Sequence, residues 1–142
     1  MSEPSPAGAF VLDVSVALAW CFRDESSPET AALLRRLATD RALVPPLWGY
    51  EVANMLGLAR RRSRLDEASL AEALALLDGL PIEIDPDSAD AALRSTLALA
   101  VSAGLPAYDA AYLELARRRS VPLATRDAEL RRAAVRLGIA LL

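Results

Sequence analysis

Short apolar runs alternate with longer helical patterns along this chain, and this alternation restricts the fold more than any other feature of the sequence. The first run, Ala9–Leu12, stops abruptly at Asp13, as expected of a strand that is buried on both faces. Pro122 restricts a later run to a sheet edge or to the start of a strand. The remaining strands are predicted at 42–44, 82–84, 121–124 and 139–142.

Helical patterns fill the segments between these runs. Ser26 and Glu29 form a capping-box pattern at the start of a helix over 28–39. Asp66 and Asp87 are predicted to cap two further helices. The first predicted helix is short and runs from the residue after Asp13 to Trp20. The other predicted helices lie at 28–39, 47–61, 66–78, 87–103, 107–118 and 127–136.

Strands that alternate with helices predict right-handed crossovers and a mainly parallel sheet with helices on both faces. The fold class is therefore α/β, with four to five strands. At 142 residues one domain is expected, over 9–142, after a short flexible polar lead-in over 1–8. One cysteine, no signal-peptide pattern and no long apolar span favour a cytoplasmic protein with no membrane partner.

The composition removes several kinds of catalysis. The chain has no histidine and no lysine, so its 16 basic residues are all arginine, against 19 acidic residues. Without histidine there is no Ser-His-Asp or Cys-His catalysis, and without lysine there is no Schiff base. An enzyme of this composition must use carboxylates, hydroxyls, arginines and a hard metal ion.

Four acidic residues are predicted to lie at one edge of the sheet. Asp13 ends the first strand and Asp127 follows the 121–124 strand, while Glu51 and Asp109 lie in the predicted first turns of helices. Sites in open α/β sheets form at the carboxyl ends of strands. Glu51 and Asp109 each interrupt an apolar stripe, which is costly unless the charge is paired or bound to a cation. The two stripes are Leu47, Met55 and Leu58 for Glu51, and Tyr112, Leu113 and Ala116 for Asp109.

Each of these acids also has a purely structural interpretation, as a helix cap or as a partner of a helix dipole. Together, however, they would repel one another unless a divalent cation lay between them. Oxygen ligands favour Mg²⁺ or Mn²⁺. Ser15 and Thr125 flank the predicted site and are interpreted either as supports for a metal-bound water or as ordinary capping hydroxyls.

The chain resembles the PIN domain, and in particular the VapC-type toxins of toxin–antitoxin pairs. The resemblance extends over 10–142 and rests on four blocks in order: FVLDVSVALAW (10–20), LWGYEVANML (47–56), GLPAYDAAYLELA (104–116) and PLATRDAEL (122–130). It implies that Asp13, Glu51, Asp109 and Asp127 are the catalytic and metal-binding acids, and that Thr125 belongs to a Thr-x-Asp motif.

The resemblance also implies a Mg²⁺- or Mn²⁺-dependent ribonuclease that forms homodimers and is neutralised by a small antitoxin. Asp13, Asp109 and Asp127 would then hold a metal-bound water, and Glu51 would bind a second ion or position that water. Arg126 borders Asp127 and is the predicted contact to an RNA phosphate. The arginine clusters at 60–64 and 117–119 lie at predicted helix C-termini and are interpreted as solvated helix ends or partner contacts, whereas Arg131 and Arg132 form a third cluster with Arg126.

Three other functions share part of this sequence pattern. A haloacid-dehalogenase-type phosphatase needs a second acid where this chain has Ser15, and usually a lysine. A response-regulator receiver needs an acidic pair and a lysine. The third alternative, a non-catalytic interaction module whose acids are structural, stays open at this point.

Overall fold

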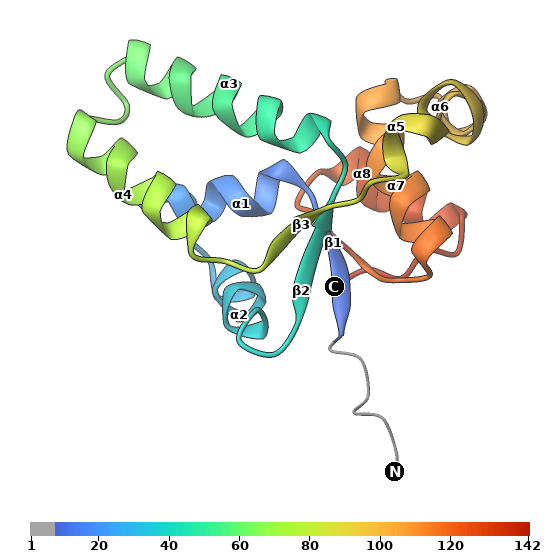
Figure 1. Ribbon diagram of the computed structural model, residues 1–142, viewed down its shortest axis with the longest axis horizontal. Helices are drawn as coiled ribbons and strands as arrows, with labels where there is room; N and C mark the ends of the chain where they lie inside the picture. Colours follow the sequence, from blue (N-terminus) through green and yellow to red (C-terminus); the bar gives the residue numbers. More distant parts are fainter. Residues whose placement is uncertain (1–7) are drawn as a thin grey trace.

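The computed structural model describes residues 8–142. A four-stranded parallel sheet lies at the centre of the molecule (Figure 1). The strands are β1 (Ala9–Leu12), β2 (Arg41–Val44), β3 (Ile82–Ile84) and β4 (Leu123–Ala124), in the order β3-β2-β1-β4. Val11 pairs with Leu43 of β2 and with Leu123 of β4. The predicted parallel α/β fold is confirmed. Except for Gly8, the predicted lead-in lies outside the described residues.

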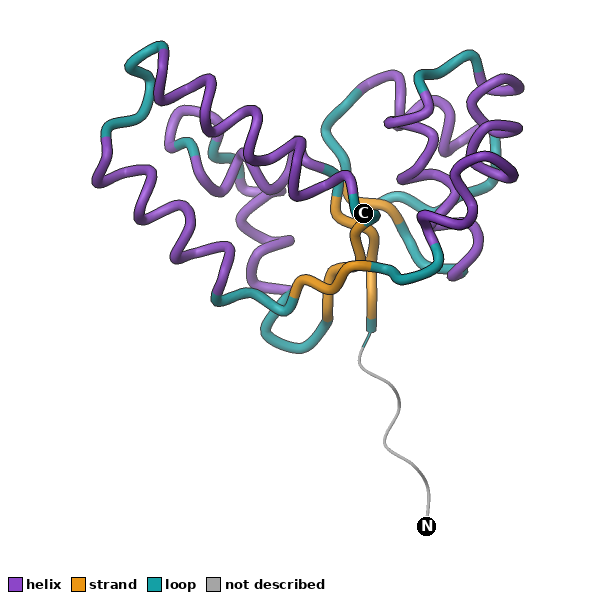
Figure 2. Tube along the Cα trace, turned by 45° about the horizontal axis from the view of Figure 1, so that its top comes forward, coloured by secondary structure: helices purple, strands orange, loops and turns teal. Residues whose placement is uncertain are grey.

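Helices surround this sheet (Figure 2). Helices α3 and α4 extend to one side, whereas α5, α6 and α7 lie on the other. None of the helices in the described part of the chain is both long and apolar enough to span a membrane. The helices are α1 (Val14–Cys21), α2 (Pro28–Arg36), α3 (Leu47–Arg61), α4 (Glu67–Asp78), α5 (Ser88–Ala91), α6 (Leu97–Ala103), α7 (Ala107–Arg119) and α8 (Ala128–Arg136), with a 3₁₀ turn η1 (Arg23–Glu25) and a π turn η2 (Ala92–Thr96).

The side chains on the two faces of the sheet pack into two separate apolar clusters. Val11, Leu43 and Leu123 enter the cluster that includes residues of α3, α7 and α8. Phe10 and Val44 point the opposite way, into a cluster with residues of α1 and the segment around α2. This alternation follows from the two-residue period of a strand. Helices therefore cover both faces of the sheet, as predicted.

Two predicted helices differ from the observed ones. Helix α2 is capped by Ser27 rather than Ser26, because Ser27 and Thr30 exchange hydrogen bonds between each hydroxyl and the other residue's backbone N–H, both at 3.1 Å. The helix also ends at Arg36 rather than at 39. The long helix predicted over 87–103 is divided into α5, η2 and α6, and Asp87 has helical dihedrals with no side-chain cap bond.

The last two predicted strands are shorter than expected. Strand β4 contains only Leu123 and Ala124, because Pro122 has no N–H to donate, although its carbonyl accepts a bond from Val11 at 2.8 Å. The predicted strand over 139–142 is reduced to a single bridge between Leu141 and Leu123. A two-residue partner offers too little edge for a longer ladder.

Candidate functional site

Asp13 lies at the centre of the carboxyl edge of the sheet, where β1 passes into α1. Its backbone N–H donates to the Ala124 carbonyl of β4 at 3.0 Å, so the ends of the two strands meet there. Its Oδ2 atom accepts hydrogen bonds from the Ser15 and Thr125 hydroxyls, both at 2.7 Å, and from the Ser15 N–H at 3.4 Å. Oδ1 has no hydrogen-bond partner among the described residues, so its lone pairs are not used by the protein there.

Ser15 and Thr125 also organise the loop after β4. The Ser15 hydroxyl accepts the N–H of Arg126 at 2.9 Å, and the Thr125 hydroxyl accepts the N–H of Asp127 at 3.1 Å. Asp127 in turn caps α8 by accepting the Leu130 N–H at 2.8 Å. Asp13 and Asp127 are therefore both helix caps, in agreement with the structural interpretation of the sequence. They also follow the ends of two neighbouring parallel strands, β1 and β4, as the site prediction requires.

Glu51 lies in the second turn of α3, not in the first as predicted. The apolar stripe around it is only partly buried, and Met55 is 38% exposed. Tyr112 of α7 donates a hydrogen bond to Glu51 Oε1 at 2.6 Å. Burial raises the pKa of the Glu51 carboxyl, the Tyr112 hydrogen bond opposes this, and the nearby charges of Asp13 and Asp109 raise the pKa further.

Asp109 lies in the first turn of α7, as predicted, and is half-buried. Burial raises the pKa of its carboxyl, and the negative charges of Asp127, Asp13 and Glu129 raise it further. The two helices thus place two carboxyls of raised pKa beside the Asp13–Asp127 edge. Like charges close together in a partly dry site are the arrangement that a cation stabilises.

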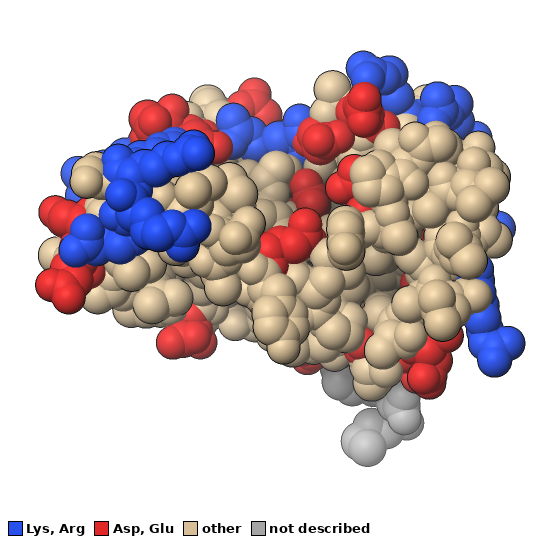
Figure 3. All heavy atoms as spheres, turned by 90° about the horizontal axis from the view of Figure 1, so that it is seen from above, with Lys and Arg blue, Asp and Glu red and all other residues tan. Residues whose placement is uncertain are grey.

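Charges among the four predicted acids therefore raise the pKa values of Glu51 and Asp109. On the face of the molecule that Figure 3 shows, acidic side chains gather along the middle. Within residues 8–142, however, no three acids or other ligand residues converge closely enough to form a ready metal cage. Their chemistry still fits Mg²⁺ or Mn²⁺, because Mg²⁺ is usually bound through one or two carboxylates with several waters and substrate phosphates.

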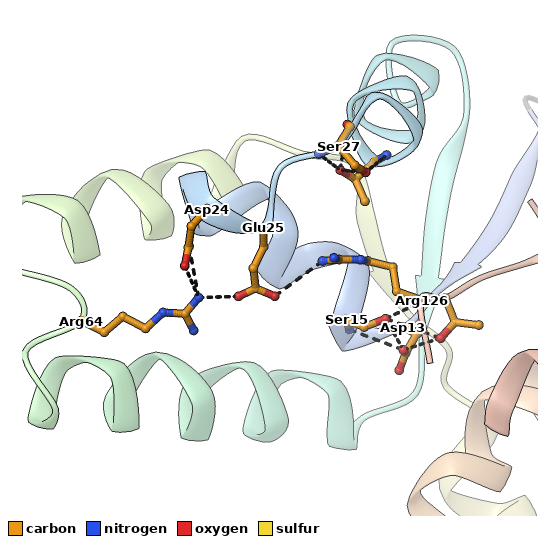
Figure 4. Close-up of polar contacts among 9 residues, drawn as sticks. Asp13, Ser15, Asp24, Glu25, Ser27, Arg64 and Arg126 are labelled. Atoms are coloured by element: carbon orange, nitrogen blue, oxygen red, sulfur yellow. Dashed lines mark hydrogen bonds and ion pairs between the residues drawn. The ribbon is translucent and has the colours of Figure 1, made fainter. Parts of the chain in front are cut away.

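Arg126 extends away from Asp13 toward a chain of charges (Figure 4). Its guanidinium lies 3.5 Å from Glu25 Oε1, and Glu25 Oε2 accepts from Arg64 at 2.8 Å. Arg64 also pairs with Asp24 and lies over the ring of Phe22, 4.0 Å from its centroid. Arg126 is thus the arginine of this network that reaches the candidate site.

Two features of the structure were not predicted. Tyr112 was interpreted only as an apolar stripe residue, although its hydroxyl binds Glu51; a tyrosine in a buried stripe does signal a polar partner, because its O–H must be satisfied. Arg118 and Arg119 are exposed at the end of α7, in agreement with their interpretation as a solvated helix end, but both also pair with the buried Asp85, at 2.8 and 3.1 Å. No sequence spacing links Asp85 to α7, so only the packing reveals this network.

The PIN domain family model matches residues 10–136 of the chain. Among curated proteins no sequence matches it. The fold is similar to the crystal structure of PAE2754 from Pyrobaculum aerophilum, with a TM-score of 0.70 and 24% identity, covering 98% of this chain and 87% of that one. It is also similar to VapBC2 from Rickettsia felis bound to a DNA fragment from their promoter, with a TM-score of 0.65 and 11% identity, covering 94% of this chain and 97% of that one.

Proposed function

This chain belongs to the PIN domain family, and we propose that it is a metal-dependent endoribonuclease that acts as the toxin of a toxin–antitoxin pair. The observation that carries the proposal is the state of Asp13. One carboxylate oxygen is held by Ser15 and Thr125, while the other has no hydrogen-bond partner within residues 8–142 and lies near the charges of Glu51 and Asp109. Such an arrangement fixes an acid in place without neutralising it.

The four acids have distinct roles in this proposal. Asp13, Asp109 and Asp127 would hold Mg²⁺ or Mn²⁺, and Glu51 would hold a second ion or orient a water. A bound ion would supply an activated water at neutral pH and would neutralise charge on the phosphodiester. The chain has no histidine to act on the RNA 2′-hydroxyl, so we propose direct hydrolysis, in which water adds across the P–O bond and leaves 5′-phosphate and 3′-hydroxyl ends.

The remaining site residues position the acids and the substrate. Ser15 and Thr125 hold Asp13 in one rotamer, and Tyr112 orients Glu51 by its hydrogen bond. Arg126 would contact a phosphate next to the scissile bond, because its own backbone is bonded to Ser15. These contacts fix the geometry before substrate arrives, which is where positioned groups contribute most to a rate.

We further propose a small antitoxin as the protein partner, a homodimer as the active assembly, and a cytoplasmic location with no membrane partner. The similarity to the structure of VapBC2 from Rickettsia felis, bound to a DNA fragment from their promoter, supports the antitoxin partner. The family membership supports RNA as the substrate.

The test is a cleavage assay of the purified protein on a panel of structured RNAs with Mg²⁺, Mn²⁺ or chelator. Asp13→Asn should abolish cleavage while the circular dichroism spectrum is retained. Asp78→Asn is the matched control, because Asp78 is exposed near the end of α4 and undergoes the same chemical change. Undiminished cleavage by Asp13→Asn would overturn the assignment of the site.

The second candidate function is a non-catalytic interaction module. It is favoured by one observation, that Asp13 and Asp127 both cap helices and so have structural roles. The two functions differ in a simple measurement. A module would cleave no RNA in Mn²⁺ and would show no divalent-ion binding by calorimetry, whereas the nuclease would show both.

A further inference from the structure

A groove lies between α2 and the start of α8, next to the candidate site. It has a volume of about 760 Å³. Helix α2 and its cap contribute Ser27, Glu29, Thr30 and Arg36, and the opposite wall carries Arg126 and Arg131. We refer to it as the α2–α8 groove.

The side chains of the α2–α8 groove carry three guanidinium groups and one carboxylate, that of Glu29. Arg131 donates to the Thr125 backbone carbonyl at 2.9 Å and forms none of the ion pairs found within residues 8–142. Arg36 pairs with Asp40 through Nε at 2.7 Å, which leaves its two terminal nitrogens without a partner in that part of the chain. The groove therefore has guanidinium donors available for an anion.

Hydrogen bonds made by Thr125, Arg126 and Arg131 connect the α2–α8 groove to the candidate site. Thr125 binds Asp13 with its hydroxyl and Arg131 with its carbonyl. Arg126 donates its N–H to Ser15, and its guanidinium, which points toward Glu25 (Figure 4), belongs to a side chain that lines the groove. A polyanionic strand cut at Asp13 would therefore meet these arginines next along its backbone.

The lining also indicates what part of a nucleic acid the groove would contact. Among residues 8–142 no aromatic side chain lines it, so this part of the chain offers no platform on which bases could stack. Guanidinium groups bind phosphate oxygens through paired hydrogen bonds. Phosphate contacts fix the position of a strand but carry no direct sequence information.

We propose that the α2–α8 groove binds the phosphodiester backbone of the RNA strand that flanks the scissile bond, with Arg36 and Arg131 as phosphate contacts. This inference rests on the proposed function. It assigns a binding path to one side of the site and predicts that recognition along this path is independent of base identity and weakened by salt.

The test compares two double variants on the same helices. Arg36→Gln with Arg131→Gln removes two groove charges, and Arg35→Gln with Arg132→Gln removes two exposed charges from the neighbouring positions, outside the groove. Binding to a fluorescent single-stranded RNA is measured by anisotropy in chelator, and cleavage is measured with Mg²⁺ or Mn²⁺.

We expect the groove variant to weaken binding by about tenfold or more. Its KM should rise above that of the wild type, and the rise should grow with the length of RNA beyond the scissile bond. Log affinity falls with log salt, and the steepness of this fall should decrease by about 1.4, since each of the two lost phosphate contacts on a single strand contributes ~0.7. The control pair should match the wild type. Truncating the RNA on either end in turn would identify the side that the groove binds.

Equal losses in the two double variants would overturn the inference, because they would show a nonspecific charge effect. If Arg131→Gln disturbs the Thr125 loop, Arg36→Glu against Arg35→Glu provides the same comparison without a site contact. An inactive wild-type protein would instead reject the proposed function, and the anisotropy comparison would still decide whether the groove binds RNA.

Discussion

The Thr125 hydroxyl donates a 2.7 Å hydrogen bond to Oδ2 of Asp13, although the two residues are 112 positions apart in the chain. This bond forms because β1 and β4 are parallel neighbours whose carboxyl ends meet, and Thr125 directly follows β4. It fixes the rotamer of the acid that the proposed chemistry depends on most. The contact therefore connects the sheet topology to the candidate site.

Replacing Thr125 with valine should impair cleavage more than it impairs folding. The change leaves Asp13 Oδ2 with the Ser15 contacts alone, and such supporting hydrogen bonds are commonly worth about 10- to 100-fold in metal affinity or activity. Thr125→Ser keeps the hydroxyl and should retain most of the rate. Single-turnover cleavage and calorimetric Mn²⁺ binding check this, and equal rates for the valine and serine variants would contradict it.

Tyr112→Phe should shift the pH dependence of cleavage. The hydrogen bond from Tyr112 lowers the pKa of the Glu51 carboxyl against the effect of burial, so its loss raises that pKa further. If ionised Glu51 is needed, the acidic limb of the rate–pH profile moves to higher pH. The lost hydrogen bond should also cost about 1 kcal/mol of unfolding free energy. Tyr50→Phe, at an 82% exposed position, is the control and should leave the profile in place.

Asp109→Asn should stabilise the metal-free protein at neutral pH. The pKa of Asp109 is raised in the folded state, so its ionisation disfavours the fold once the pH exceeds the unfolded value. The gain should vanish in acid, where the carboxyl is protonated in both states. Thermal unfolding tests this, since about 1 kcal/mol corresponds to roughly 3 °C in a chain of this size.

Adding metal should make the wild type more stable than Asp109→Asn, which reverses their order in the metal-free state. Mg²⁺ or Mn²⁺ should raise the Tm of the wild type, because a ligand that binds only the folded state stabilises it. The asparagine variant should show a smaller rise. A wild-type Tm that does not respond to either ion would count against the proposed metal site.

Asp85→Asn should destabilise the protein without touching the candidate site. Burial alone would raise the pKa of the Asp85 carboxyl, but hydrogen bonds from Arg118 and Ser88, with the charges of Arg118 and Arg119, outweigh it and lower the pKa. Asp85 is buried while its two arginine partners are partly exposed, so losing these charge-assisted hydrogen bonds should cost about 1.5 to 3 kcal/mol.

The stabilisation from Asp85 should also depend on pH with a definite sign. A lowered folded-state pKa contributes stability above the ordinary aspartate value of about 3.9, and this stability is lost as the pH falls through the folded-state pKa. The unfolding free energies of wild type and Asp85→Asn should therefore converge in strong acid. A difference that is constant from neutral pH to acid would show that the ion pair is not its source.

Local sequence patterns were sufficient to predict most of the fold. The run Ala9–Leu12 and the acid after it are a strand and a cap in the structure, and Pro106 precedes α7 as expected. The failures have two sources, a competing local pattern and tertiary packing. Ser27 replaced Ser26 as the cap, and the 139–142 strand was lost because β4 is too short to pair with it.

The sequence by itself determined the chemistry that is available to this protein: carboxylates and arginines without histidine or lysine, with acids placed after apolar runs. Composition and period are local properties, so a single chain reveals them directly. Only the tertiary structure decided which groups meet. The Tyr112–Glu51 bond, the Thr125–Asp13 bond and the α2–α8 groove all join residues distant in sequence, and such contacts depend on strand order and helix packing.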